Sequence, residues 1–286
     1  MECRTLLAAA TGRLAEAGVE SPRVDAELLL AHVLAVPRAR LLTLVDVAED
    51  AAGRYDALLA QRADRVPLQH LTGRAPFRHL ELAVGPGVFV PRPETEQLAG
   101  WALERLAGMA EPVVVDLGAG SGALALSLAH EHPGARITAV ERDPGAIDWT
   151  RHNAAARAAA GDTPVEVLAG DMTDPELLRS LDGAVDLLVS NPPYVPDGAR
   201  VPREVADHDP PLALWGGPDG LDVVRGLLRT AARLLKPGGR LGIEHADQQG
   251  SALPALVRSH GGFADVEDHA DLAGRPRFTT ARRSPG

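Results

Sequence analysis

Cysteines and long apolar runs are scarce in this sequence. Cys3 is the single cysteine among 286 residues, so neither a disulfide framework nor a cysteine-ligated metal cluster can form within one chain. The short apolar run at residues 6–10 is interrupted by Arg13, well before it reaches the length that spans a bilayer. We therefore expect a cytoplasmic protein with no signal peptide, no transmembrane helix and no bound metal.

The chain also has no excess of basic residues. It carries 39 acidic and 29 basic side chains, which give a formal net charge of -10. A protein that binds free duplex DNA usually presents a basic face to the phosphates, so we expect no direct nucleic acid binding. The 45% hydrophobic content is enough for one substantial core and a smaller second domain.

Residues 1–75 are predicted to form a small helical domain. Gly18 ends a first helix, and Ser21 and Pro22 begin a second in N-cap and first-turn positions. In that second helix, apolar residues recur at helical spacing, namely Val24, Leu28, Ala31 and Ala35. Such a domain could be a packing appendage or a module that docks a substrate, and the residues alone favour neither.

A β-hairpin is predicted to link this domain, over residues 76–92, to a domain formed by residues 93–286. The apolar period changes to two between residues 77 and 90, and Gly85-Pro86-Gly87 supplies a turn before a second strand at 88–90. A helix to about Leu106 follows. Its first turn holds proline and acidic residues, which helix N-termini favour.

After Pro112 the sequence alternates short apolar runs with longer helical stretches. This pattern predicts an α/β fold with a doubly wound, Rossmann-like parallel sheet. The expected strands are 113–117, 136–141, 165–169, 185–190 and 240–245, with a closing hairpin of 264–269 and 277–282. The expected helices include 122–130, 146–160 and 221–235, the last ended by residues 236–239.

Candidate ligand-binding residues follow the first three of these strands, where open α/β sheets bind their ligands. The first strand leads into a loop of small residues that lets the backbone approach a ligand closely, Gly118-Ala119-Gly120-Ser121-Gly122. Glu141 follows the second strand and could accept hydrogen bonds from ribose hydroxyls, while Asp171 and Met172 could contact adenine. Each feature taken singly could instead be an ordinary turn or cap.

The glycine spacing separates two kinds of cofactor. In a dinucleotide-binding loop the third glycine follows two intervening residues, whereas here Gly118, Gly120 and Gly122 alternate with single residues. The acidic Asp116 beside the loop would repel phosphates but would suit a sulfonium and an amino group. These observations favour S-adenosylmethionine over a dinucleotide.

The fourth strand ends in Asn191-Pro192-Pro193-Tyr194, a candidate clamp for a flat NH2 group. The Asn191 side-chain carbonyl and the Pro192 backbone carbonyl can each accept one N–H and so orient the nitrogen toward a methyl donor. Two prolines stiffen the turn, and Tyr194 can pack on the flat face of the substrate. The alternative is a proline-rich turn that simply leaves a strand.

With these motifs the chain resembles the class I methyltransferases, and among them the release factor glutamine methyltransferases, over nearly its whole length. The other matching segments are 67–73, 91–96, 116–122, 212–214, Glu244-His245 and 248–250. Departures from the family pattern are Glu141, where relatives often have aspartate, and Met172, where an aromatic residue is often found.

The resemblance implies that the enzyme methylates the glutamine of the Gly-Gly-Gln motif in class 1 peptide chain release factors. By matching positions, residues 118–122, Glu141, Met172 and Asn191 would contact S-adenosylmethionine, and residues 191–194 would hold the glutamine. Arg92 and Glu94 are further candidate substrate contacts, although they could equally be a helix-capping pair.

Two alternative functions stay open. One is an adenine amino methyltransferase that flips bases, which the acidic charge and the 3% aromatic content disfavour. The other is a non-catalytic adaptor that binds the cofactor.

Overall fold

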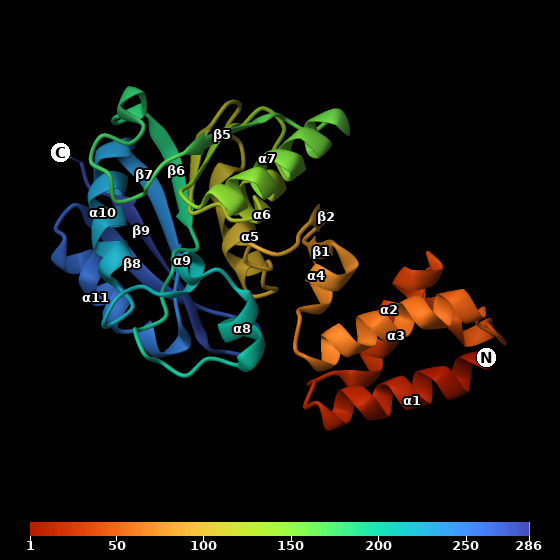
Figure 1. Ribbon diagram of the computed structural model, residues 1–286. Coiled ribbons are helices and arrows are strands. Elements are labelled where there is room, and N and C mark those ends of the chain that lie inside the picture. The colour runs from red at the N-terminus through yellow and green to blue at the C-terminus, as the bar shows by residue number, and fades with distance from the viewer. Residues whose placement is uncertain (286) are drawn as a thin grey trace. The chain divides into compact units, whose positions relative to one another are not determined.

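A computed structural model describes residues 1–285, which form two compact units (Figure 1). Unit 1 comprises residues 1–74, 84–86 and 201–208, and unit 2 comprises the rest of the described chain. None of the helices in this part of the chain is long and apolar enough to cross a membrane. The sequence did not indicate that residues 201–208 join the N-terminal unit.

Unit 1 is helical. Its elements are α1 (Cys3–Glu16), α2 (Pro22–Leu34), η1 (Arg38–Thr43), α3 (Glu49–Ala63), α4 (Leu68–Thr72) and α8 (Arg203–His208). Its core contains Leu29, Leu30 and Tyr55, and the Tyr55 hydroxyl donates to the Ala26 carbonyl over 2.9 Å. The apolar residues noted at helical spacing in α2 do not all face the core. Val24 is 37% exposed, and Ala35 is the exposed, left-handed residue that ends the helix, because Ala26, Leu29 and Leu30 face the core instead.

The hairpin lies earlier in the chain than predicted. Strands β1 (Arg74–Phe77) and β2 (Leu80–Ala83) form a two-stranded sheet, and the predicted second strand at 88–90 is absent from this described region. Arg78 makes the turn in a left-handed conformation, with φ of 51°. Its guanidinium is held by Glu131 at 2.5 and 2.7 Å, and its backbone N–H donates to Glu96 over 3.0 Å. These partners are distant in sequence, so local turn rules favoured the glycine-rich segment instead.

Unit 2 contains a seven-stranded sheet in the order β5-β4-β3-β6-β7-β9-β8. The first five strands in this order run parallel, β9 runs antiparallel to β7, and β8 pairs antiparallel with β9. This confirms the predicted doubly wound α/β sheet with a closing hairpin. The strands are β3 (Val113–Leu117), β4 (Arg136–Glu141), β5 (Val165–Ala169), β6 (Val185–Ser190), β7 (Leu235–Glu244), β8 (Phe263–Ala270) and β9 (Pro276–Arg283).

Helices cover both faces of this sheet (Figure 1). Alternate residues of β3 enter different cores: Val114 packs with α5 and α6, whereas Val113 and Val115 pack with α10 and α11. The helical elements of unit 2 are α5 (Thr95–Leu106), α6 (Ala123–Glu131), α7 (Pro144–Ala159), η2 (Arg179–Leu181), α9 (Pro211–Leu214), α10 (Asp222–Leu234), η3 (Asp247–Gln249) and α11 (Ala252–Ser259).

Strand β7 begins at Leu235 rather than at residue 240 as predicted. Residues 236–239 form an irregular stretch inside it, because Val185 pairs with Leu235 and Leu187 pairs with Arg240. The glycines and proline that were expected to separate helix from strand are therefore taken into a bulge.

The strand order reverses between β3 and β6. From β3 the chain proceeds outward through β4 and β5, and from β6 it proceeds in the other direction through β7. Helices on opposite faces diverge at such a point and leave a crevice at the carboxyl ends of the two strands. The glycine loop follows β3 and the candidate clamp follows β6, so the sheet brings both to this position.

Candidate active site

The loop after β3 makes a succession of turns that requires glycine. Gly118, Gly120 and Gly122 have φ of 81°, 58° and 87°, the left-handed region that other residues rarely adopt. The Gly118 and Ala119 N–H groups donate to the Val140 carbonyl of β4 over 2.8 and 3.0 Å, and Gly122 begins α6. The loop is thus fixed to the sheet.

Three of the predicted site residues meet at Gly118. A Cβ atom at this position would lie 2.8 Å from Met172 Cε and 3.8 Å from the Asn191 carbonyl oxygen. Met172 follows β5 and Asn191 follows β6, so ends of three strands converge here. Only glycine leaves room for this approach.

Glu141 lies at the end of β4 with its carboxylate against the loop. Its Oε2 accepts from the Gly120 N–H over 2.9 Å, and its Oε1 accepts from the N–H groups of Arg142 and Asp143 over 2.7 and 2.9 Å. A carboxylate has about four lone-pair sites, so acceptor capacity remains for a ligand. These backbone donors fix the orientation of the side chain that was predicted to hold ribose.

Asp171 is held by its neighbours after β5. The N–H and hydroxyl of Thr173 donate to its Oδ1 over 2.8 and 2.7 Å, and Arg142 donates to its Oδ2 over 3.2 Å. Partial burial opposes ionisation, but these hydrogen bonds outweigh it and lower the pKa of Asp171. The carboxylate is therefore charged, and its contact with adenine stays a prediction.

Asp116 faces the start of α6. It is fully buried in β3, and its Oδ2 accepts from the Ala125 N–H over 3.1 Å. Burial raises the pKa of Asp116 to about 7, against the effect of this hydrogen bond, and the nearby negative charge of Glu141 raises it further. Asp116 was predicted to suit a cationic cofactor. In the structure, it instead contacts the N-terminus of α6.

Two residues of α7 that the sequence reasoning missed hold the loop from the other side. The Thr150 hydroxyl donates to the Gly120 carbonyl over 2.6 Å, and the Asn153 amide donates to the carbonyls of Ser121 and Ala83, each over 2.9 Å. Both side chains are buried. Their spacing of i, i+3 places two polar residues on one helix face, a pattern that could have identified them.

The candidate clamp is anchored at its first residue. The Asn191 side-chain nitrogen donates to the hydroxyl of Thr95, a buried residue at the start of α5, over 3.2 Å. One position earlier, the Ser190 hydroxyl donates to the Leu117 carbonyl over 2.5 Å. Because the nitrogen of Asn191 is engaged by Thr95, its side-chain oxygen is the group left to accept a substrate N–H.

The segments that matched the family after the clamp enclose its backbone. The Gln249 side chain donates to the carbonyls of Tyr194 and Asp219 over 3.1 and 3.2 Å. A Cβ atom at Gly216 would lie 2.6 Å from the Pro193 carbonyl oxygen. The glycine-rich turn after α9 and the glutamine of η3 therefore fix the course of the clamp.

Tyr194 contacts a buried carboxyl group at the end of β7. Its hydroxyl donates to Glu244 Oε1 over 3.5 Å, and Glu244 is 1% exposed. Burial raises the pKa of Glu244 to about 7 and also raises the pKa of Tyr194. The adjacent His245 contacts Asp268 over 2.8 Å. Sequence reasoning quoted Glu244 only as part of a family motif and gave it no partner.

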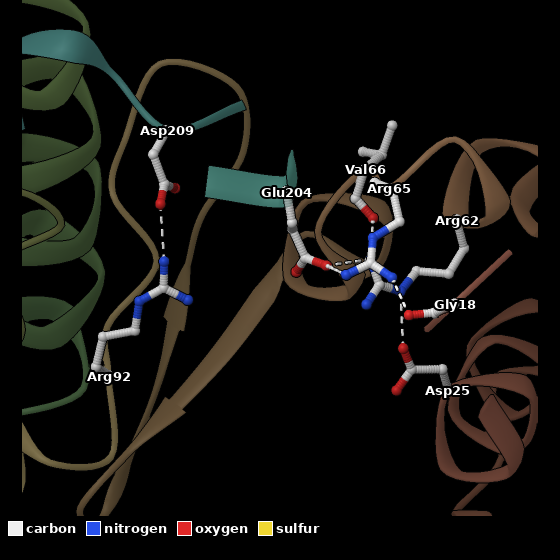
Figure 2. A network of polar contacts seen from close by, with 8 residues as sticks. All are labelled: Gly18, Asp25, Arg62, Arg65, Val66, Arg92, Glu204 and Asp209. Atoms are coloured by element: carbon white, nitrogen blue, oxygen red, sulfur yellow. Dashed lines mark hydrogen bonds and ion pairs between the residues drawn. The ribbon is translucent and has the colours of Figure 1, made fainter. Parts of the chain in front are cut away.

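Arg92 and Glu94 precede α5 and differ in their surroundings. Arg92 donates to Asp209 Oδ2 over 2.8 Å (Figure 2). Its guanidinium carbon lies 4.6 Å from the centre of the Phe89 ring. Glu94 is exposed, and its negative charge contributes to the raised pKa of Glu244. Their contact with substrate stays a prediction.

Comparisons with known proteins find relatives over nearly the whole chain. The PrmC N-terminal domain family matches residues 5–73, and the methyltransferase small domain family matches residues 80–207. The release factor glutamine methyltransferase of Mycolicibacterium smegmatis is 52% identical over 280 residues, 98% of this chain and 97% of the relative. That of Streptomyces coelicolor is 52% identical over 282 residues, 97% of each. This chain belongs to the release factor glutamine methyltransferase family.

Solved structures support the fold of this methyltransferase. A Thermus thermophilus 16S rRNA N2 G1207 methyltransferase, solved with AdoMet and guanosine, is 26% identical with a TM-score of 0.51, covering 73% of this chain and 49% of that one. A Pyrococcus furiosus methyltransferase has a TM-score of 0.50 at 17% identity, covering 72% of this chain and 90% of that one. The resemblance seen in the sequence is confirmed, and the chain is an S-adenosylmethionine-dependent methyltransferase.

The residues of this family member fit the usual cofactor of methyltransferases, S-adenosylmethionine. The close approach at Gly118 places a thioether and a backbone carbonyl beside the loop, and Glu141 keeps acceptor capacity for hydroxyl groups. A thioether packs well on an aromatic ring such as adenine, so Met172 can replace the aromatic residue that is often found there.

Proposed function

We propose that this enzyme methylates the side-chain amide nitrogen of the glutamine in the Gly-Gly-Gln motif of class 1 peptide chain release factors. The names of its relatives support the substrate class. The observation that carries the proposal is the position of Asn191, whose backbone lies beside Gly118 and whose amide is anchored on Thr95. This position supports a single site that combines the cofactor loop and the amide clamp.

S-adenosylmethionine would be held by residues from the ends of four strands: Gly118, Ala119, Gly120, Ser121, Gly122, Glu141, Asp171, Met172 and Asn191. When bound, it supplies the methyl group as an activated sulfonium. The loop gives close backbone contact, the carboxylate of Glu141 accepts from hydroxyl groups, and Met172 supplies an apolar surface.

The clamp would orient and activate a poor nucleophile, because the lone pair of an amide nitrogen is delocalised into its carbonyl. The Asn191 and Pro192 oxygens accept its two N–H bonds, which directs the nitrogen toward the methyl carbon and stabilises the positive charge that develops on it. Tyr194 covers the flat face of the amide. Loss of one N–H proton after transfer restores a neutral secondary amide.

A transfer assay tests the substrate. The protein is incubated with labelled S-adenosylmethionine and either a class 1 release factor, the same factor with Gly-Gly-Ala in place of Gly-Gly-Gln, duplex DNA, or 16S rRNA. We expect label in the unaltered factor alone. Label in either nucleic acid would favour amino methylation of a base, the chemistry named for the Thermus thermophilus neighbour. No label in any sample would favour a non-catalytic adaptor.

The substitution Asn191→Ala tests the clamp. We expect kcat with the release factor to fall about 100-fold or more, because a preorganised hydrogen bond to the reacting group is lost. Cofactor affinity, measured by calorimetry, should change little, because the backbone carbonyl that faces the loop is retained. Full activity of this variant would contradict the proposed role.

The helical unit would dock the release factor. The PrmC N-terminal domain family matches residues 5–73 within it, and the exposed residues of this part include Leu42 and Val45, at 77% and 72%. Docking through this separate unit would supply binding energy that a short glutamine-containing peptide would lack.

A further inference from the structure

One segment of the chain leaves the clamp, enters the helical unit and returns. Residues 201–208 belong to unit 1, whereas the residues on both sides of them belong to unit 2. The chain before this segment carries the clamp, and the chain after it begins with Asp209. We call residues 195–209 the strap. Its position in unit 1 and the course of the clamp are linked by continuous backbone.

The strap is anchored in unit 1 by α8. This helix has six residues, none of them buried, so little apolar surface holds it. Its Glu204 Oε2 accepts from Arg62 Nη1 of α3 over 2.7 Å (Figure 2). Arg65 Nη2 lies 3.6 Å from the same oxygen. These polar contacts attach α8 to the rest of unit 1.

Arg62 is suited to this attachment because its position is fixed by other groups. Its side chain is 7% exposed, its Nε donates to Asp25 over 2.7 Å, and its Nη1 also donates to the Val66 carbonyl over 2.9 Å. Burial alone would lower the pKa of Arg62, but the carboxylates of Asp25 and Glu204 raise it, so the guanidinium stays charged. If Glu204 is removed, Asp25 still neutralises Arg62.

The other end of the strap is fixed in unit 2. Asp209 is 5% exposed and accepts from Arg92 over 2.8 Å (Figure 2). Arg92 in turn packs over the Phe89 ring. Before α8, the Val195 N–H donates to the Leu214 carbonyl over 2.8 Å. The strap is thus held on both sides of α8 by unit 2 and at α8 by unit 1.

We propose that Glu204 is a positioning residue: by holding α8 on Arg62, it couples the helical unit to the Asn191–Tyr194 clamp. The coupling makes the position of the clamp depend on the unit that would dock the release factor. This inference rests on the proposed function for its substrate, while its structural part concerns the chain alone.

Two substitutions in α8 test the coupling. Glu204→Ala removes the contact with buried Arg62, whereas Asp207→Ala removes an exposed ion pair with Arg203, at 3.0 Å, and serves as the matched control. In Glu204→Ala we expect kcat at saturating release factor to fall about 10-fold, because small misplacements of positioning groups reduce rates by up to about 100-fold. Cofactor affinity should match that of the control.

Hydrogen exchange separates positioning from general loss of structure. In Glu204→Ala, amide exchange should rise at residues 191–208 and stay at control levels in α2 and α3. A rise throughout unit 1, an effect on KM alone, or unchanged exchange at residues 191–200 would each overturn the inference. If the wild-type protein methylates no release factor, the proposed substrate is wrong, and the exchange comparison still decides whether Glu204 positions the clamp.

Discussion

At the scale of the residue, Gly118 shows how strongly the site depends on one missing methyl group. Gly118→Ala would place Cβ 2.8 Å from Met172 Cε at a φ of 81°, so the loop or the thioether must move. We expect the dissociation constant for S-adenosylmethionine, measured by calorimetry, to rise about 10-fold or more, since an uncompensated overpacking costs about 1–3 kcal/mol.

Gly108→Ala is the matched control for this substitution. Gly108 has a similar φ of 83°, but an added Cβ would have no neighbour within 4 Å. It should lower the free energy of unfolding by about 1–2 kcal/mol through backbone strain, with no change in cofactor affinity. Equal affinity losses in the two variants would show that strain, rather than the approach of Met172, is responsible.

Glu244 gives a pH dependence of stability. Burial raises its pKa from 4.5 to about 7, so between these values the folded protein binds a proton that the unfolded chain has released. The stabilisation from this proton is complete below about pH 4.5 and is lost as the pH rises through 7. Glutamine at this position cannot titrate. The free energy of unfolding of the wild type minus that of Glu244→Gln should therefore fall with rising pH, by at most about 3 kcal/mol.

Urea unfolding followed by tryptophan fluorescence measures this difference, because Trp101, Trp149 and Trp215 all lie in unit 2 with Glu244. The contribution of Asp116, whose pKa is also raised to about 7, is present in both proteins and cancels. A difference that is constant from pH 5 to pH 8 would show that Glu244 is ionised throughout this range.

At the scale of the element, η3 and the turn after α9 contribute to holding the clamp. Gln249→Ala removes the donor to the carbonyls of Tyr194 and Asp219. We expect kcat to fall about 10-fold with little change in cofactor affinity, because these partly buried acceptors lose their partner while the glycine loop is untouched. The neighbouring Gln248 is exposed, so Gln248→Ala should behave as wild type in the same steady-state assay. Similar rates for both variants would contradict this role.

Some elements can be predicted from the local sequence alone, and others cannot. The strands β3 to β6 were predicted with the observed bounds because each is a short apolar run flanked by turn residues. The hairpin was displaced because Arg78 makes its turn with help from Glu96 and Glu131, which are distant in sequence. Turn propensities do not predict an arginine with a left-handed backbone conformation.

At the scale of the whole molecule, the two units should respond differently to ligand. The proposed cofactor residues all lie in unit 2. By mass action, S-adenosylmethionine at about 100 times its dissociation constant should stabilise this unit by about 2.7 kcal/mol. Hydrogen exchange should slow in the sheet and much less in α1 to α3. Equal protection of the core amides of both units would show that they unfold as one cooperative body.

The sequence by itself determined the family, the doubly wound sheet and the residues after each parallel strand. Apolar periodicity decides which segments become strands and helices, and the carboxyl ends of neighbouring parallel strands must lie together. Thus Gly118, Glu141, Met172 and Asn191 could be named as candidates before their contacts were seen.

Only the tertiary structure decided which distant polar groups meet. Three contacts join residues from separate elements: Met172 with Gly118, Tyr194 with Glu244, and Glu204 with Arg62. Such pairs carry no periodic pattern. They depend on where folded elements place individual atoms, and their energies depend on burial, which belongs to the folded molecule and not to any local segment.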